Sequence, residues 1–87
     1  MTRPSMRPIG QVEMFFVKAQ AVAVRLISPL RLGETIYVRG QTTDFCERVT
    51  SLQINHVSVG EAPLGALVGI KVDTRCRKHD IVYKLST

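Results

Sequence analysis

Apolar and polar residues alternate in short runs along most of this chain, which is the pattern of half-buried β-strands. Residues 9–27 (IGQVEMFFVKAQAVAVRLI) predict two adjacent strands with a tight connection near residues 18–20. An amphipathic helix is the alternative for this segment, because residues 14–26 contain neither Gly nor Pro. Its many β-branched residues and its doubled Phe favour strands.

The same alternation continues to the end of the chain. TIYVRG (residues 35–40) is typical of a half-buried strand, and CERVTSLQINHVSV (46–59) alternates with a change of phase that indicates a bulge or bend. LVGIKV (67–72) has the character of a buried strand, and IVYKL (81–85) follows as the last one. Six short strands separated by turn signals predict an all-β fold, a small closed barrel of six or seven strands. Closure would also remove exposed sheet edges.

The length of 87 residues leaves room for one domain. Residues 1–8 carry Arg3, Pro4, Arg7 and Pro8 and predict a flexible basic arm. Residues 9–87 then form the single barrel domain. Apolar residues make up 45% of the chain, which is enough for a core, and aliphatic side chains must fill it because there is no Trp.

Two segments of the chain repeat one pattern. Residues 30–38 read LRLGETIYV and residues 76–84 read CRKHDIVYK, so that Glu34 corresponds to Asp80, each followed three residues later by Tyr. Each acid could accept backbone N–H hydrogen bonds within a turn and so orient the strand that follows. The repeat therefore predicts two similar corners in the fold.

These residues resemble the second domain of translational GTPases such as elongation factor Tu and initiation factor two. The family's corner pattern is L-x-L-G-D/E-x-I/V-x-V-x-G, and a second segment reads A-x-x-G-x-x-V-G-I. The residues that carry the resemblance are Leu30, Leu32, Gly33, Glu34, Ile36, Val38, Gly40, Val49, Ala62, Gly65, Val68, Gly69, Ile70, Asp80 and Val82. From about Ile9 to Leu85 the chain is similar to the small stand-alone proteins called translation elongation factor-like. The resemblance implies a Greek-key barrel like domain two.

Two departures from that family limit what the resemblance implies. His79 stands where the family has Gly before the acid, so that corner could have a different turn. QAVAVRLIS (residues 20–28) replaces the family's G-R-G-T-V-x-T-G-R-V strands, so binding of aminoacyl-tRNA does not carry over. A GxxxxGK[ST] phosphate loop is also absent from the sequence, which excludes a nucleotide cofactor of that type.

The chain is basic, with 12 Lys and Arg against 7 Asp and Glu, a net charge of +5 and a pI near 9.8. This balance favours an anionic partner such as RNA or the ribosome, although it is also compatible with a merely solvated surface. Strand alternation in RCRKH would place Arg75 and Arg77 on one face and Cys76 on the other. The candidate phosphate-binding residues are Arg39, Arg48, Lys71, Arg75, Arg77 and Lys78. Phe45 could stack on a base or plug the end of the barrel.

Other chemistry is weakly supported. The four Cys and His residues (Cys46, His56, Cys76 and His79) contain one Cys-x2-His spacing and no CxxC pair, so no metal site is predicted. The acids are isolated and no catalytic triad can be assembled, so we expect neither an enzyme nor a cofactor. The first residues carry no export-signal pattern, and no apolar run approaches the ~20 residues that cross a bilayer. These features predict a cytoplasmic protein without a membrane partner.

Two functions therefore remain open. The first is a non-catalytic module that associates with RNA or the ribosome through its basic face, helped by Arg3 and Arg7, with a steep salt dependence. The second is an adaptor that docks on a larger enzyme or factor. Its signature would be an exposed apolar patch including Met14, Phe15 or Phe16, and a weak salt dependence.

Overall fold

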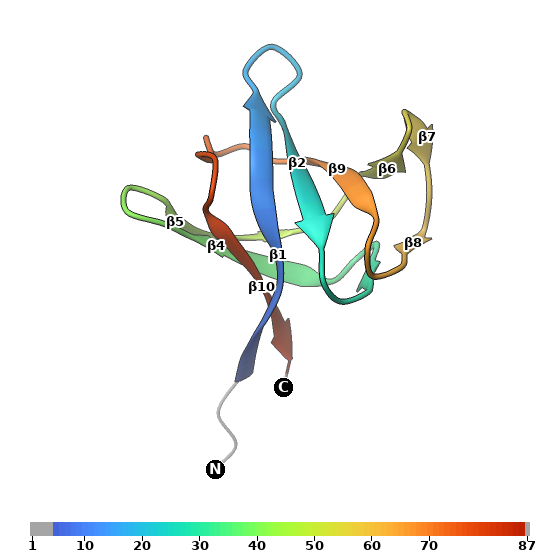
Figure 1. The fold of residues 1–87 in the computed structure, drawn as a ribbon, viewed down its shortest axis with the longest axis horizontal. Coiled ribbons are helices and arrows are strands. Elements are labelled where there is room, and N and C mark those ends of the chain that lie inside the picture. The colour runs from blue at the N-terminus through green and yellow to red at the C-terminus, as the bar shows by residue number, and fades with distance from the viewer. Residues whose placement is uncertain (1–4, 87) are drawn as a thin grey trace.

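The computed structural model describes residues 5–86, and all regular structure in that range is β (Figure 1). Within it there is no helix, and hence none that could cross a membrane. The strands are β1 (Ser5–Phe16), β2 (Ala21–Leu26), β3 (Leu30–Arg31), β4 (Thr35–Arg39), β5 (Asp44–Arg48), β6 (Leu52–Ile54), β7 (Val57–Ser58), β8 (Glu61–Ala62), β9 (Leu67–Lys71) and β10 (Ile81–Ser86).

Eight of these strands form one antiparallel sheet in the order β5-β4-β10-β1-β2-β9-β6-β7, and β3 and β8 form a separate pair. The first and last strands lie side by side in the middle of the large sheet, whereas β5 and β7 lie at its two ends (Figure 1). The prediction of an all-β fold is confirmed, but the prediction of a closed barrel is wrong. The end strands β5 and β7 do not pair with each other, so the sheet stays open.

Half of the predicted basic arm, residues 5–8, falls within the described chain. Its residues 1–4 lie outside the described residues, whereas residues 5–8 belong to β1 and pair with β10. The register of this pairing shifts between Pro8 and Gly10. Pro has no backbone N–H to donate to a neighbouring strand, so a strand accommodates Pro best where its pairing is irregular.

The predicted pair of strands near the N-terminus is confirmed as the hairpin β1–β2. Its connection spans Val17 to Gln20, where the Gln20 amide donates to the Val17 carbonyl at 3.3 Å. A second register shift, between Val12 and Met14, leaves Glu13 as an extra residue in β1. Such a bulge bends the strand, which helps the long β1 to follow the twisted sheet.

One face of the large sheet and the β3–β8 pair enclose an aliphatic core. The sheet contributes to it through registered valines, for example Val12 opposite Val24 and Val24 opposite Val68. The buried apolar residues are Ile9, Val12, Val22, Val24, Leu26, Leu30, Ile36, Val38, Val49, Leu52, Ala62, Val68, Ile70, Val72, Cys76 and Val82. Burying a branched aliphatic side chain contributes about 1.5–3 kcal/mol, so this set accounts for a core without Trp.

The segment 46–59 is more broken than its alternation predicts. β5 ends at Arg48, and Val49 leaves the strand to bond with the first corner: its amide donates to Glu34 O at 2.8 Å and its carbonyl accepts from Gly33 N at 2.8 Å. A turn with positive φ at Asn55 (51°) and His56 (65°) then separates β6 from β7. The expected change of phase is real, but it is a sharp bend between separate strands.

The two predicted corners are confirmed and have the same hydrogen bonds. At the first corner the Arg31 amide donates to Glu34 Oε1 at 2.6 Å, and at the second the Arg77 amide donates to Asp80 Oδ2 at 2.8 Å. The acid's own amide donates back at each corner, to Arg31 O at 3.2 Å and to Arg77 O at 3.1 Å. Each acid thus closes a four-residue turn, as the repeated sequence indicates.

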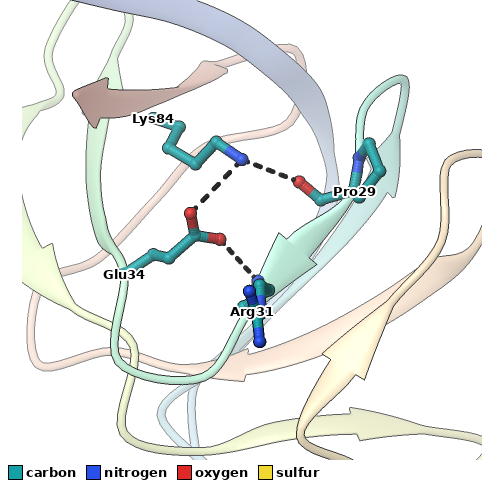
Figure 2. A network of polar contacts seen from close by, with 4 residues as sticks. All are labelled: Pro29, Arg31, Glu34 and Lys84. Atoms are coloured by element: carbon teal, nitrogen blue, oxygen red, sulfur yellow. Dashed lines mark hydrogen bonds and ion pairs between the residues drawn. The ribbon is translucent and has the colours of Figure 1, made fainter.

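The corners differ in what surrounds the acid. Figure 2 shows Glu34 between the Arg31 amide and Lys84, whose Nζ lies 3.3 Å from the carboxylate and donates to Pro29 O at 3.2 Å. Asp80 instead is buried, with 5% of its surface exposed. Lys84 belongs to β10, so the ion pair connects the first corner to the last strand.

The strands that follow the corners, β4 and β10, pair with each other about a local two-fold axis. Tyr37 lies opposite Tyr83, with ring centroids 6.1 Å apart. The Tyr37 hydroxyl donates to the Asp44 carboxylate, and this hydrogen bond, with smaller effects of burial and of the Asp44 charge, raises the pKa of the Tyr37 hydroxyl. The repeat in the sequence thus corresponds to a symmetric pair of corners and strands.

His79 adopts the same left-handed backbone as its counterpart Gly33, with φ of 77° against 93°. We therefore expect His79→Gly to stabilise the fold by about 0.5–1 kcal/mol, because Gly removes the Cβ strain of this conformation. Gly33→Ala should destabilise the fold by a similar amount, since it introduces that strain. Urea unfolding of both variants checks this pair, and changes of equal sign would contradict it.

Candidate functional site

The six basic residues predicted to bind phosphates do not form one patch. Arg39 and Arg48 lie at opposite ends of the β4–β5 pair, since Arg39 faces Asp44 and Arg48 faces Thr35. The Arg48 side chain donates from Nε to the Gly33 carbonyl at 3.2 Å, so it is engaged at the first corner. Lys71 ends β9 and lies opposite Ala21.

Only three of the six gather in one place, the loop between β9 and β10. Arg75, Arg77 and Lys78 are exposed there, and the Arg77 Nε donates to Thr42 Oγ1 at 2.8 Å. Cys76 is buried between them, with 2% of its surface exposed. The predicted separation of Cys76 from its arginine neighbours is confirmed, although a loop and not a strand produces it.

Neither Phe45 nor Cys76 is fully exposed. Phe45 is half-buried and packs against the core. Burial, followed by the charges of Asp80 and Glu47, raises the pKa of the Cys76 thiol to about 12, which opposes thiolate formation. Cys46 is exposed and unpaired. Within residues 5–86, no three His, Cys, Asp or Glu side chains lie close enough together to hold a metal ion.

A different site emerges on the outer face of the large sheet, where small residues follow one another across neighbouring strands. Met14, Ala23, Gly69 and Gln53 lie in one row across β1, β2, β9 and β6. The next row contains Phe16, Ala21 and Lys71. We call the strip formed by Ala21, Ala23 and Gly69 the small-residue groove.

The small-residue groove is hollow because its side chains are short. Two shallow hollows, of about 230 and 210 Å³, lie over it, one toward Lys71 and the other toward Leu67. A Cβ built on Gly69 would meet no atom within 4 Å. This face of the sheet therefore has room for side chains that the described chain does not supply.

Apolar side chains border the groove. Met14, Phe16 and Leu67 keep 53%, 48% and 43% of their surfaces exposed. Contiguous exposed apolar surface of this kind is typical of an interaction site. The expected patch thus forms from Met14 and Phe16 but not from Phe15, which packs against the core.

The groove residues themselves were missed by the sequence analysis. The signal for them is present in AVAV (residues 21–24), where small Ala alternates with Val. Since the valines are buried, the alanines must face outward. Gly69 occupies the matching outward position in β9, which only the register of the strands reveals.

Comparison with known proteins finds a relative by sequence. No protein-family model matches the chain. The "Uncharacterized protease MJ0090" of Methanocaldococcus jannaschii is 40% identical over 78 residues, which cover 88% of this chain. The chain spans only 19% of the length of that relative.

Two solved structures share the fold. The C-terminal domain of a Geobacillus thermoleovorans protein assigned to the U32 peptidases superposes with a TM-score of 0.83 at 15% identity, covering 90% of this chain and 91% of that domain. Its selenomethionine variant superposes with the same TM-score at 14% identity, covering 87% and 96%. At these identities the likeness establishes the fold alone.

These findings overturn the resemblance to translation factors. The proteins similar to this chain are named as a protease and as a U32 peptidase domain, not as elongation or initiation factors. The interpretation as an RNA- or ribosome-binding module, drawn from that resemblance and from the basic charge, is wrong, because the similar proteins are of the peptidase type. The shared corner motif has a simpler origin, because a corner of this type needs a left-handed residue before the acid and an acid that accepts the turn amide.

Proposed function

We propose that this chain is a non-catalytic docking domain that packs against a larger protein of the peptidase type. The observation that carries the proposal is the small-residue groove with its border of Met14, Phe16 and Leu67. The comparisons support it, because the matched relative is about five times longer than the matched segment and the similar fold is a C-terminal domain.

The physical case is that the groove can accept apolar side chains at low cost. Strand backbones in the middle of a sheet are already hydrogen-bonded, so a partner that covers Ala21, Ala23 and Gly69 has no unpaired backbone group to satisfy there. The exposed side chains of Met14 and Phe16 then gain from leaving water. Apolar cores with polar rims are typical of stable interfaces.

Several of the acids and one of the thiols are engaged in structural contacts or buried. Glu34 and Asp80 hold the two corners, and the Glu47 carboxylate accepts the Asp73 amide at 3.1 and 3.3 Å. Cys76 is buried with a raised thiol pKa. This use of the acids and the thiol in structural contacts supports a binding role over an enzymatic one.

The test is a pulldown from cell lysate with the tagged chain, at low and at moderate salt, with and without ribonuclease. The Gly69→Leu and Gly60→Leu variants are tested in the same way. Both glycines have open space at the Cβ position, so both variants should fold, as thermal unfolding would verify. We expect a larger protein that survives salt and ribonuclease, is retained by Gly60→Leu and is lost with Gly69→Leu, because only Gly69 lies in the groove. Loss of capture by moderate salt or ribonuclease, or equal capture by both variants, would contradict the proposal.

A further inference from the structure

The second half of β1 has an edge that no strand of the described chain covers. β10 pairs with β1 only as far as Gln11. Val12 then makes two hydrogen bonds to the residues before β10: its amide donates to Asp80 O at 2.8 Å, and its carbonyl accepts from the His79 amide at 2.9 Å. Beyond Val12, the registered strand neighbour of residues 14–16 is β2, on the other side. An uncovered edge presents backbone N–H and C=O groups to an incoming strand.

A cleft of about 290 Å³ runs along this edge. Its strand side consists of Glu13, Met14 and Phe15, and its loop side of Arg75, Cys76, Arg77 and Lys78. In Figure 1 the segment between β9 and β10 crosses behind the β1–β2 hairpin and turns back beside β1. The half-buried Phe15 and the buried Cys76 make the inner part of the cleft apolar.

The rim of the cleft is strongly basic. Among the residues that line the cleft, Arg75, Arg77 and Lys78 are basic and Glu13 is the one acid. In residues 5–86 the only ion pair within 4.0 Å is Lys84 with Glu34. Arg77 is oriented by Thr42 Oγ1 through its Nε, which leaves its terminal N–H groups as donors. The cleft therefore combines an extended backbone template, an apolar floor and an excess of positive charge.

We infer that this cleft binds an extended acidic peptide segment, which adds as a strand to the edge of β1. Strand addition takes affinity from backbone hydrogen bonds and selectivity from alternate side chains. Residues 13–16 span about 13 Å, which matches roughly four residues of an added strand. Apolar side chains of that strand would contact Phe15 and Cys76, and its carboxylates would meet Arg75 and Lys78. This site shares Met14 with the border of the small-residue groove, but its basic rim lies on the loop between β9 and β10, so substitutions of Arg75 and Lys78 test it separately from Gly69→Leu.

The probe is a fluorescein-labelled, capped hexapeptide in which Glu and Val alternate, titrated with the purified chain by fluorescence polarisation. The expected result is saturable binding that weakens about fivefold with Arg75→Glu and with Lys78→Glu, since each reverses a charge at an exposed rim. Arg7→Glu makes the same charge change at the distant end of β1 and should leave the affinity within about twofold. The same peptide with Lys in place of Glu should not bind.

Two further peptides separate strand addition from simple charge attraction. One carries N-methyl groups on its odd residues and the other on its even residues, so that each lacks the N–H donors of one strand edge. We expect one of the two to lose binding and the other to keep it, because only one edge of the added strand faces β1. Equal binding by both methylated peptides, equal effects of Arg7→Glu and Arg75→Glu, or displacement by a uridine hexanucleotide at the same concentration would overturn the inference.

Discussion

Gly10→Ala should destabilise the fold by about 3 kcal/mol, the cost of forcing an atom into a fully packed site. A Cβ at this position would lie 2.6 Å from Val24 Cγ1 and 2.7 Å from the Arg25 carbonyl oxygen. Neither neighbour can yield easily, because Val24 is fully buried and the Arg25 oxygen is backbone. Gly10 also pairs with Leu26 on one side and Val82 on the other, so a shift would separate β1 from both central neighbours.

Thermal unfolding measures this effect directly. For a domain of this size, about 3 kcal/mol corresponds to a fall in Tm of roughly 15 °C. Gly60→Ala is the matched control, because a Cβ there meets no atom within 4 Å, and it should change stability by less than about 0.5 kcal/mol. Equal Tm values for the two alanine variants would show that β1 and β2 can separate without penalty.

Gly40→Ala should cost about 2–3 kcal/mol through the second corner. The added Cβ would lie 1.9 Å from Asp80 Oδ1, so the carboxylate must move. Asp80 is buried, and its other oxygen accepts the Arg77 amide at 2.8 Å. Displacing it therefore breaks the hydrogen bond that closes the turn before β10.

A double-mutant cycle with Asp80→Ala isolates this mechanism. Asp80→Ala alone should also destabilise the fold by about 2 kcal/mol, because the Arg77 amide loses a charged acceptor. Once the carboxylate is gone, Gly40→Ala has little left to displace and should add less than about 1 kcal/mol. Additive losses in urea unfolding would mean that Gly40 acts through something other than Asp80.

Much of the fold follows from short-range patterns in the sequence. The hairpin β1–β2 and the strand β4 follow from the alternation of apolar and polar residues. In β4 the inward positions, such as Ile36 and Val38, are indeed buried. The two corners were predicted from the repeat of an acid three residues before a Tyr, and each acid does accept the turn amide. These are local features, in which the residues that interact lie within a few positions of each other.

The features that were not predicted depend on distant residues. Whether the sheet closes depends on the ends β5 and β7 meeting, which no local pattern determines. The small-residue groove exists because Gly69 comes opposite Ala23 and Gln53 opposite Gly69, in strands far apart in the chain. The uncovered edge of β1 likewise depends on where β10 stops pairing.

The resemblance to translation factors shows how a local pattern can mislead. Its first segment surrounds the corner at Gly33 and Glu34, where the positive φ and the accepted amide are needed for the turn itself. Another residue that carried it, Asp80, has the same task at the second corner. A motif that a turn demands on physical grounds recurs in unrelated proteins, so it identifies the turn and not the family.

The position of β10 between β4 and β1 has a consequence for how the chain folds. The central sheet cannot be completed until residues 81–86 have arrived, because they separate the hairpin β1–β2 from the pair β4–β5. Bringing β10 to β1 closes a loop of nearly the whole described chain, which makes the topology one of high contact order. Folding should therefore be slow for a domain of this size, with the two hairpins forming early and the joining of β10 to both of them limiting the rate.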